Sequence, residues 1–336
     1  MAGNITIKDI AREAGVSIAL VSFVMNNRVE ADGKQKYRVS DQTRNRVLEV
    51  AARLDYRPNS AARTLRQGHS RTIGVVLSDM ANIFYGIIAR ELEDEIFRRG
   101  YTPLFGSTDE NPEKFDRLIR SFIEKGVEGF VIVPCEGSAP SVRHLMETGH
   151  PFVVIDRYHP DFQVPSVLTD NEDAMQKAIA AIREQGATRL EMVSYGMRIS
   201  SMTDRERCFR ECLGADAFIY TVPFEHVAQE AERVADEVIR KGTDGLVIAS
   251  NVLSVAVIKA LHRRGVRIPQ EVRIVGFDYS NIYGVFSPAI PYILQPLPEI
   301  ARSAAALLFD LVDRKENGKT SRDNPETIIL KTTLMQ

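Results

Sequence analysis

The first part of the chain carries apolar positions at helical spacing, with capping residues in front of them. Thr6 can cap a first helix, because Asp9 stands three residues on, as in a capping box. Gly15 supplies a tight turn, and Ser17 can cap a second helix with valines on its inner side. Two short helices joined by a glycine turn predict a helix-turn-helix, whose second helix fits the DNA major groove. A helical hairpin that only packs is the alternative.

A third helix and a short cationic segment are predicted after this pair. Ser40 can cap a helix over residues 41–54, and Pro58 stops it. Asn59 can cap the next segment, residues 60–66, which is too short to form a stable helix alone in water. A cationic segment that carries a leucine between two domains needs a partner to fold, and DNA would supply one.

From Arg71 onward, short apolar strands alternate with helices. The strands are predicted at residues 72–77, 101–107, 129–133, 151–155, 189–194, 218–222, 245–249 and 272–277. The helices are predicted at residues 82–99, from 111, 140–148, 172–185, 203–213, 225–240, 252–264 and 297–316. This alternation predicts parallel sheets covered on both faces, so the core is of the α/β class. The series runs twice, which indicates two similar lobes with a cleft between them.

The residues that follow these strands contain the candidate chemistry, because a ligand of an open α/β sheet sits outside the carboxyl ends of the strands. The candidates are Asp79, Asn82, Phe84, Tyr85, Arg157, Ser201, Arg205, Asn251 and Asp278. Carboxylates, amides and arginines can pair with hydroxyl groups while an aromatic ring covers the apolar face of a sugar, so the set suits a polyhydroxylated ligand. Each residue could instead cap a helix or pair across the cleft, and Asp79 could simply stabilise the helix N-terminus after it.

The charge of the chain is divided unevenly. The formal net charge is −2, yet residues 1–72 hold 13 Lys and Arg against 7 Asp and Glu. A basic N-terminal part on an acidic body is typical of a protein that binds nucleic acid. Neutralisation of phosphates would supply most of its sequence-independent affinity and make the binding sensitive to salt.

Other classes of protein lack their signals in this sequence. No apolar run reaches the length of a membrane span and no signal segment opens the chain, so we expect a soluble cytoplasmic protein with no membrane partner. Cys208 and Cys212 share a helix face, but no histidine stands at ligand spacing, so core packing is favoured and no metal or cofactor is predicted. The nucleophile elbow, the phosphate loop and the dinucleotide fingerprint are absent, which argues against an enzyme.

Several runs of residues together resemble one family, the lactose/galactose repressors (LacI/GalR). The runs are TIKDIAREAGVS from Thr6, RVSDQTRNRVLEVAARLDYRPN from Arg38, SAARTLR before TIGVV, VGFDYSN and YILQP. The resemblance covers nearly the whole chain and implies a small all-α helix-turn-helix DNA-binding domain plus an α/β two-lobed periplasmic-binding-protein-like core. It divides the chain into residues 1–58 for DNA binding, 59–70 as hinge helix and linker, 71–170 with 297–322 as the first lobe, and 171–296 with 323–336 as the second. The crossings between lobes are expected near residues 170, 295 and 322–326.

The resemblance also implies which residues contact DNA. Ile18, Ala19 and Phe23 correspond to positions that touch base edges, and contact with thymine methyl groups is expected because none of them can donate paired hydrogen bonds. Packing of Phe23 inside the domain is the alternative. Ser17, Ser22 and Asn26 suit phosphates or flanking bases. Leu65 is expected to wedge into a base step of the minor groove. The other predicted DNA-binding residues are Thr6, Tyr56, Asn59, Ala62 and Arg63. The stretch 28–38 is longer than usual in the family, and it either reaches the DNA backbone or stays a solvated loop.

By family position, Phe84, Arg157, Arg205 and Asp278 are the expected effector contacts, and Asn251 replaces an aspartate. The implied function is a transcriptional regulator, most often a repressor, under allosteric control of a small molecule that is most often sugar-like. One hinge segment per subunit implies a homodimer on a near-palindromic operator. The core alone would also suit a transport-type solute-binding protein, but the missing signal segment and the attached DNA reader argue against that interpretation. No leucine-rich heptad tail follows Leu330, so a tetramer built on such a tail is not expected.

Overall fold

The computed structural model describes residues 5–25, 39–56, 69–318 and 325–336. The chain forms two compact units, Met1–Ser70 and Arg71–Gln336. None of the helices in these described ranges is both long and apolar enough to cross a lipid bilayer.

In its described residues, the N-terminal unit forms three helices, α1 (Ile7–Ala14), α2 (Ile18–Met25) and α3 (Asp41–Arg53). The predicted capping box is present, since the Thr6 backbone N–H donates to the Asp9 carboxylate at 2.9 Å. Gly15 adopts the left-handed conformation with φ of 64°, which lets the chain turn at the end of α1. The Ser17 hydroxyl accepts from the Leu20 N–H at 3.2 Å, as a cap of α2. The predicted helix-turn-helix is therefore confirmed, and its inner faces meet in one core: Ile10, Ala11, Ala14, Val21, Val24, Val47, Val50 and Ala51.

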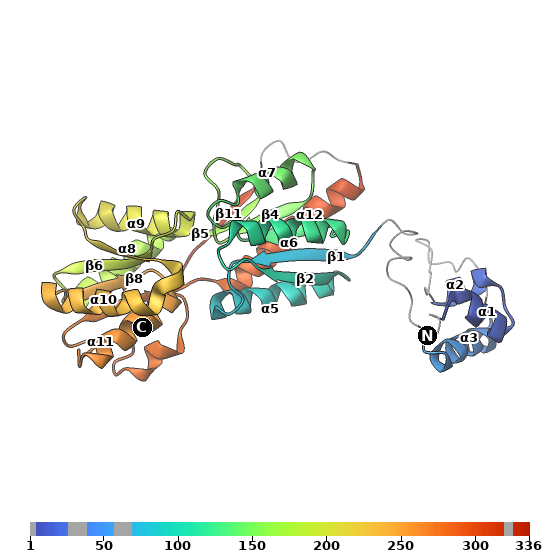
Figure 1. Cartoon of the computed structure of the whole chain (residues 1–336), viewed down its shortest axis with the longest axis horizontal. Helices are drawn as coiled ribbons and strands as arrows, with labels where there is room; N and C mark the ends of the chain where they lie inside the picture. Colours follow the sequence, from blue (N-terminus) through green and yellow to red (C-terminus); the bar gives the residue numbers. More distant parts are fainter. Residues whose placement is uncertain (1–4, 26–38, 57–68, 319–324) are drawn as a thin grey trace. The chain divides into compact units, whose positions relative to one another are not determined.

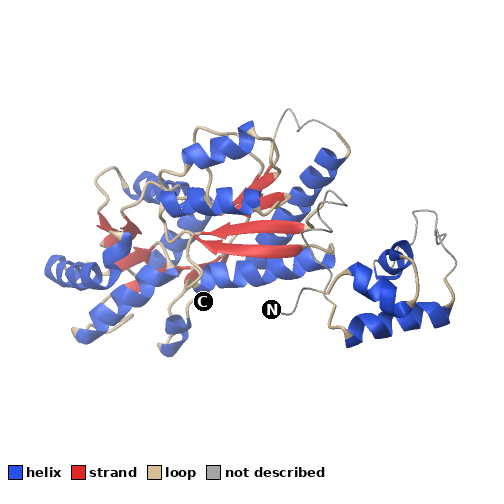
Figure 2. Cartoon of the chain, turned by 45° about the vertical axis from the view of Figure 1, so that its right-hand side comes forward, coloured by secondary structure: helices blue, strands red, loops and turns tan. Residues whose placement is uncertain are grey.

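The first lobe of the core unit is built on a six-stranded parallel sheet of order β11-β5-β4-β3-β1-β2. Its strands are β1 (Thr72–Leu77), β2 (Thr102–Ser107), β3 (Gly129–Ile132), β4 (Phe152–Ile155), β5 (Ser166–Thr169) and β11 (Thr327–Leu330). Its helices are α5 (Ile83–Arg98), α6 (Pro112–Glu124), α7 (Ala139–Glu147) and α12 (Leu297–Glu316). The side chains of β1 alternate between two cores, because Ile73, Val75 and Leu77 pack with α5 and α12, whereas Val76 packs with α6 and α7. Figures 1 and 2 show these helices on the two faces of the sheet.

The second lobe is built on a second six-stranded sheet, of order β12-β10-β9-β8-β6-β7. Its strands are β6 (Leu190–Tyr195), β7 (Ile219–Val222), β8 (Gly245–Ile248), β9 (Arg273–Phe277), β10 (Tyr292–Leu294) and β12 (Thr333–Met335). Its α-helices are α8 (Asn171–Glu184), α9 (Ser200–Leu213), α10 (Val227–Lys241) and α11 (Asn251–Arg263), with short 3-10 helices at Phe224–His226 and Asn281–Val285. Only β12 runs antiparallel to its neighbour among the described strands. The repeated α/β series thus gives the predicted two-lobed α/β core.

The structure corrects the expected end of the chain. The sequence placed residues 323–336 in the second lobe, but β11 pairs with β5 of the first sheet and only β12 joins the second. The third crossing therefore lies between these two strands, at Lys331 and Thr332 rather than at residues 322–326. The reason is that β5 would otherwise leave the edge of the first sheet unpaired. Backbone hydrogen bonds from Ser166 to Glu326 and from Asp170 to Leu330 bind β11 to the exposed side of β5, and a four-residue edge strand gives little local signal of its partner. Strands β5 and β10 were also not predicted from the sequence.

Close packing at Gly276 in β9 gives a stability prediction. A Cβ atom built there would overlap the hydroxyl oxygen of Tyr283, a buried side chain. We expect Gly276→Ala to lower the free energy of unfolding of the core by about 1–3 kcal/mol or more, because a well-packed interior cannot absorb an extra methyl group. Urea denaturation followed by circular dichroism measures this change.

Gly86→Ala serves as the matched control for that substitution. Gly86 lies within α5, and an added Cβ would meet no heavy atom within 4 Å. Alanine favours a helix by about 1 kcal/mol over glycine, so this variant should be as stable as the natural protein or more so. Equal losses in both variants would show that steric overlap with Tyr283 is not the cause.

Candidate functional site

A cavity of about 50 Å³ lies between the two lobes of the core unit, at the carboxyl ends of the strands. Its walls include every predicted effector residue except Asn251: Asp79, Asn82, Phe84, Tyr85, Arg157, Ser201, Arg205 and Asp278. Pockets that hold small ligands usually measure about 300–1,000 Å³, so in this conformation the protein's own side chains fill most of the space. A ligand of that size needs more space than this conformation leaves.

Local structure explains how the strands present these side chains. Asn82 caps α5, where its side-chain oxygen accepts from the Phe84 N–H at 3.0 Å. Asp156 directly follows β4 of the first lobe with φ of 67°, and Asp278 directly follows β9 of the second lobe with φ of 65°. Left-handed backbone at a non-glycine residue carries a steric cost that commonly marks a functional position. The same turn at both strand ends aims one carboxylate from each lobe at the cavity.

Arg157 is held by a dense buried network in the first lobe. Its two Nη atoms donate to the two Glu110 carboxylate oxygens at 2.8 and 2.7 Å. Its Nε donates to Asp156 at 3.2 Å, and further hydrogen bonds run to the Tyr85 hydroxyl and to the carbonyl of Pro134. The side chains of Arg157 and Glu110 are only 7% and 6% exposed. The guanidinium is therefore saturated by protein groups.

Arg205 of α9 has the same charge but a different set of contacts. Its Nε donates to the side-chain oxygen of Asn171 at 2.9 Å, and its Nη1 donates to the carbonyl of Ala249 at 2.7 Å. The guanidinium carbon lies 4.4 Å from the centre of the Phe277 ring. Its Nη2 donates no hydrogen bond to any described residue, although Arg205 is only 2% exposed. Arg205 also lines the cavity.

Asp278 links the cavity to the strands that connect the lobes. One of its carboxylate oxygens accepts from the side-chain amide of Gln295 at 2.7 Å, and the Gln295 carbonyl oxygen in turn accepts from the Thr169 hydroxyl. Burial raises the pKa of Asp278 to about 6, against the opposing effects of the Arg205 charge and the Gln295 hydrogen bond. Gln295 and Thr169 both lie where the chain passes between the lobes. The hydrogen bonds of Asp278 therefore connect the cavity to the segments that join the lobes.

Several hydrogen bonds join the lobes around the cavity. The Asn251 side-chain amide donates to the side-chain oxygen of Asn82 at 2.9 Å, so Asn251 bridges the lobes where the sequence predicted an effector contact. The Tyr158 N–H donates to the Ser200 hydroxyl at 2.7 Å, and the Tyr158 hydroxyl donates to Asp204 at 3.1 Å. These contacts hold the lobes together over the nearly filled cavity.

Sequence reasoning missed part of the cavity wall. Glu110, Tyr195, Phe224 and Gln295 line it but were not among the predicted site residues. Each follows or ends a strand, so the rule that selected the others could have found them. Glu110 was overlooked because it stands just before the Asn111-Pro112 helix start, where the pattern indicates capping instead.

The DNA-binding predictions fall partly on described residues. Ser17, just before α2, and Ile18 and Ala19, in its first turn, are exposed, with Ile18 at 49% of its full accessibility. Ser22 is half-buried, and Tyr56 packs against the helical core. The Thr6 hydroxyl donates to Asp9 at 2.6 Å, within the capping box. The remaining predicted contacts lie outside the described residues: Asn26, Asn59, Ala62, Arg63 and Leu65.

The burial of Phe23 bears on one of these predictions. The sequence placed it on the outer face of α2, but its side chain is only 6% exposed. Helix α2 is apolar along almost its whole length, so helical spacing alone could not tell its inner face from its outer face. This burial favours the alternative in which Phe23 packs inside the domain.

Ile18 and Phe23 should therefore respond differently to truncation. We expect Phe23→Ala to destabilise the N-terminal unit by about 3 kcal/mol, as is usual for a buried aromatic ring. Ile18→Ala should change stability by less than about 0.5 kcal/mol, because the residue is exposed. The same change should weaken DNA binding roughly tenfold if its methyl groups contact thymine. Thermal melts and fluorescence anisotropy with labelled DNA separate the two effects, and a large loss of stability in Ile18→Ala would contradict the assignment.

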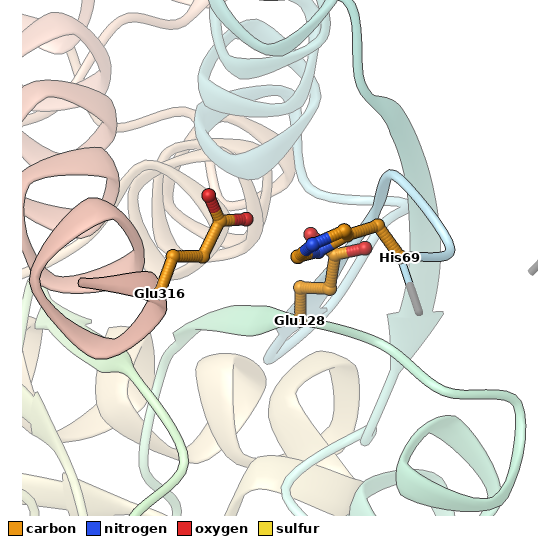
Figure 3. A group of neighbouring side chains, drawn as sticks. All are labelled: His69, Glu128 and Glu316. Atoms are coloured by element: carbon orange, nitrogen blue, oxygen red, sulfur yellow. The ribbon is translucent and has the colours of Figure 1, made fainter. Parts of the chain in front are cut away.

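Two further carboxylates, Glu128 and Glu316, belong to the core unit and are drawn in Figure 3 with His69 of the N-terminal unit. Glu128 accepts from the backbone N–H of Arg71 at 2.6 Å. Burial, together with these two carboxylates, raises the pKa of Tyr101 to about 12. Within the core, Glu128 thus has a structural role at the start of β1.

The comparisons with known proteins agree along the whole chain. Residues 6–59 match the family of bacterial regulatory proteins of the lacI family, and residues 165–334 match the periplasmic binding protein-like domain. The ribose operon repressor of Bacillus subtilis (strain 168) is 30% identical, over 98% of this chain and 98% of its own length. Catabolite control protein A of Priestia megaterium is 27% identical, over 93% of this chain and 94% of its own.

A solved structure shares the fold. The crystal structure of the Lac repressor bound to ONPG in the repressed state superposes with a TM-score of 0.82 at 18% identity, covering 99% of both chains. These relatives are transcriptional regulators rather than enzymes. The helix-turn-helix unit and the two-lobed core of this chain correspond to the two family matches. The chain belongs to the LacI family and is a DNA-binding transcriptional regulator.

Proposed function

We propose that this protein is a repressor whose affinity for operator DNA is controlled by a small sugar-like effector that binds between the two core lobes. A homodimer binds a near-palindromic operator through paired helix-turn-helix domains. The effector favours one relative orientation of the lobes, and this orientation is transmitted to the residues that connect the core to the DNA-binding domain.

The observation that carries the proposal is the set of unpaired polar groups in the cavity. The Arg205 Nη2 donates no hydrogen bond to the described part of the chain, and the Ser201 hydroxyl, in a residue only 3% exposed, likewise has no partner there. Asp278 has one carboxylate oxygen committed to Gln295 and the other uncommitted among described residues. Buried polar groups are normally satisfied, so groups left open at a cavity wall favour a ligand that supplies both donors and acceptors. Hydroxyl groups of a sugar do both.

The surrounding aromatic residues fit the same ligand. Phe84 and Tyr85 meet edge to face with ring centres 4.9 Å apart, and both line the cavity. Phe224 and Tyr195 line the cavity from the second lobe. An aromatic surface can cover the apolar face of a sugar ring while polar groups bind its edge. The name of the ribose operon repressor, the 30% identical relative, is in keeping with a sugar effector.

A two-step experiment tests the proposal. A thermal-shift screen of the purified protein against sugars and sugar derivatives should find a compound that stabilises the folded core, since a ligand at about 100 times its Kd adds roughly 2.7 kcal/mol. The DNA sequence bound by the protein is then selected from random duplexes, and its Kd is measured with and without that compound. We expect the Kd to change by about 5- to 150-fold. A stabilising compound that leaves DNA affinity unchanged would contradict the proposed allosteric control.

Leu65 gives a separate test of the DNA-binding mode. The residue lies outside the described residues, and its role as a minor-groove wedge follows from the family resemblance alone. Apolar wedges unstack a base step and bend the duplex so that more of the protein can contact it. We expect Leu65→Ala to lose operator affinity far more than fold stability, as measured by gel shift and thermal melt. Equal damage to both would reject the wedge.

A further inference from the structure

We propose that the interlobe cavity selects an uncharged polyhydroxylated ligand and rejects phosphorylated or otherwise anionic relatives of that ligand. This inference rests on the proposed function of the same cavity and narrows the chemical class of its effector. It follows from which charged groups line the cavity and from which of them are already paired.

Carboxylates outnumber cations in the cavity wall. Four acidic side chains and two arginines line it: Asp79, Glu110, Asp156, Asp278, Arg157 and Arg205. An anionic ligand in this cavity is repelled strongly by these carboxylates, because little water is present to screen the charges from one another. The field of the wall therefore opposes an anion unless one of the two arginines is free to pair with it.

Arg157 is not free to do so. Its Nη atoms donate to both oxygens of Glu110, and its Nε donates to Asp156. An anionic ligand could reach this guanidinium only by displacing Glu110, which would leave a buried carboxylate without its partner. Loss of a buried partner strands the remaining charge in a poorly solvated site, so this exchange is unfavourable.

In Arg205, the Nη2 atom donates no hydrogen bond to a described residue, and the charge of the guanidinium interacts with the carboxylate of Asp278. Burial raises the pKa of Asp278, and the positive charge of Arg205 opposes part of that rise. A phosphate or carboxylate at the Nη2 atom would therefore come under the influence of the Asp278 charge as well. A hydroxyl group has no such conflict, since it can accept from Arg205 and donate to the uncommitted oxygen of Asp278. The Ser201 hydroxyl, also unpaired among the described residues, adds a third neutral contact.

Matched pairs of compounds test the proposal. The full-length protein is titrated calorimetrically with D-ribose and D-ribose 5-phosphate, with D-glucose and D-glucose 6-phosphate, and with the other common aldoses and their monophosphates. We expect an uncharged sugar to bind and its phosphorylated counterpart to bind at least about tenfold more weakly, because like charges repel each other strongly in a poorly solvated site. A phosphorylated compound that binds as tightly as its parent sugar, or more tightly, overturns this inference and leaves the proposed function standing. If no compound of either kind binds, the proposed function fails and the inference falls with it.

Asp79→Asn tests the electrostatic cause without disturbing the Arg157 network. Asp79 is half-buried, and its carboxylate accepts a hydrogen bond from the Ala81 N–H. Removing this charge should raise the affinity for the sugar phosphate relative to the sugar several-fold. Asp116→Asn is the control, because Asp116 does not line the cavity and pairs with Arg120 at the surface. In the control, the ratio of the affinity for the sugar phosphate to the affinity for the sugar should stay unchanged. If this ratio is also unchanged in Asp79→Asn, the charge of the cavity wall does not determine the preference for the uncharged sugar.

Discussion

Replacing Arg157 by alanine is expected to lower the free energy of unfolding of the core by about 3–5 kcal/mol. The substitution removes the only described cation that contacts Glu110 and Asp156, and it leaves the almost fully buried Glu110 carboxylate without its ion pair. It also removes a donor to the Tyr85 hydroxyl. Urea denaturation of the full-length protein measures this loss.

Arg120→Ala is the control for this experiment. Arg120 pairs with Asp116 at 2.7 Å, but its side chain is 60% exposed on α6. Exposed ion pairs within a helix contribute about 0.3–0.5 kcal/mol, so this variant should be almost as stable as the natural protein. If Arg157→Ala costs no more than Arg120→Ala, the buried network does not stabilise the first lobe.

Replacing Arg205 by alanine is expected to weaken effector binding about 30-fold or more, and the response of DNA binding to the effector should be lost with it. Truncating one partner of a buried, hydrogen-bonded charged contact typically costs about 2–5 kcal/mol of binding free energy. Arg205 lines the cavity, and its Nη2 donates no hydrogen bond to a described residue. Its Nε anchors α9 to the Asn171 side chain at the start of α8. Calorimetric titration with the sugar that most stabilises the natural protein measures the first effect. A DNA-binding assay with and without that sugar measures the second.

Arg207→Ala separates loss of the ligand contact from a general loss of charge on α9. Arg207 lies on the same helix, is 52% exposed and pairs with Glu211. Its removal should leave effector affinity within about twofold, as expected for an exposed site away from the cavity. Thermal melts of both variants establish that each is folded before binding is compared. Unchanged affinity in folded Arg205→Ala would place the ligand elsewhere in the cavity.

The contrast between Arg157 and Arg205 could not be drawn from sequence. Both arginines were predicted as effector contacts, and both line the cavity. Their different roles depend on Glu110, which is 47 residues away from Arg157 along the chain. A strand-end rule selects residues by position and carries no information on which of them neutralise one another.

Local interactions along the chain determine the positions of many helices and the fold class of this protein. Capping residues and helical spacing located α1, α2 and α3, and the bounds predicted for α12 agree with those observed, Leu297–Glu316. These features depend on neighbours within a few residues, which is why a sequence pattern suffices. The repeated alternation of strands and helices likewise indicated the α/β class, and the family motifs indicated the kind of regulator.

Tertiary structure determined what depends on distant partners. The burial of Phe23 in a nearly all-apolar helix, the division of the last strands between two sheets, and the pairing of Arg157 with Glu110 each required contacts that the local sequence does not encode. Asn251 shows the same limit, because its amide bridges to Asn82 of the other lobe. Burial, strand pairing and charge neutralisation are properties of surfaces that meet only when the chain has folded. The sequence alone therefore located the side chains around the cavity, and the fold determined which of them remain open to a ligand.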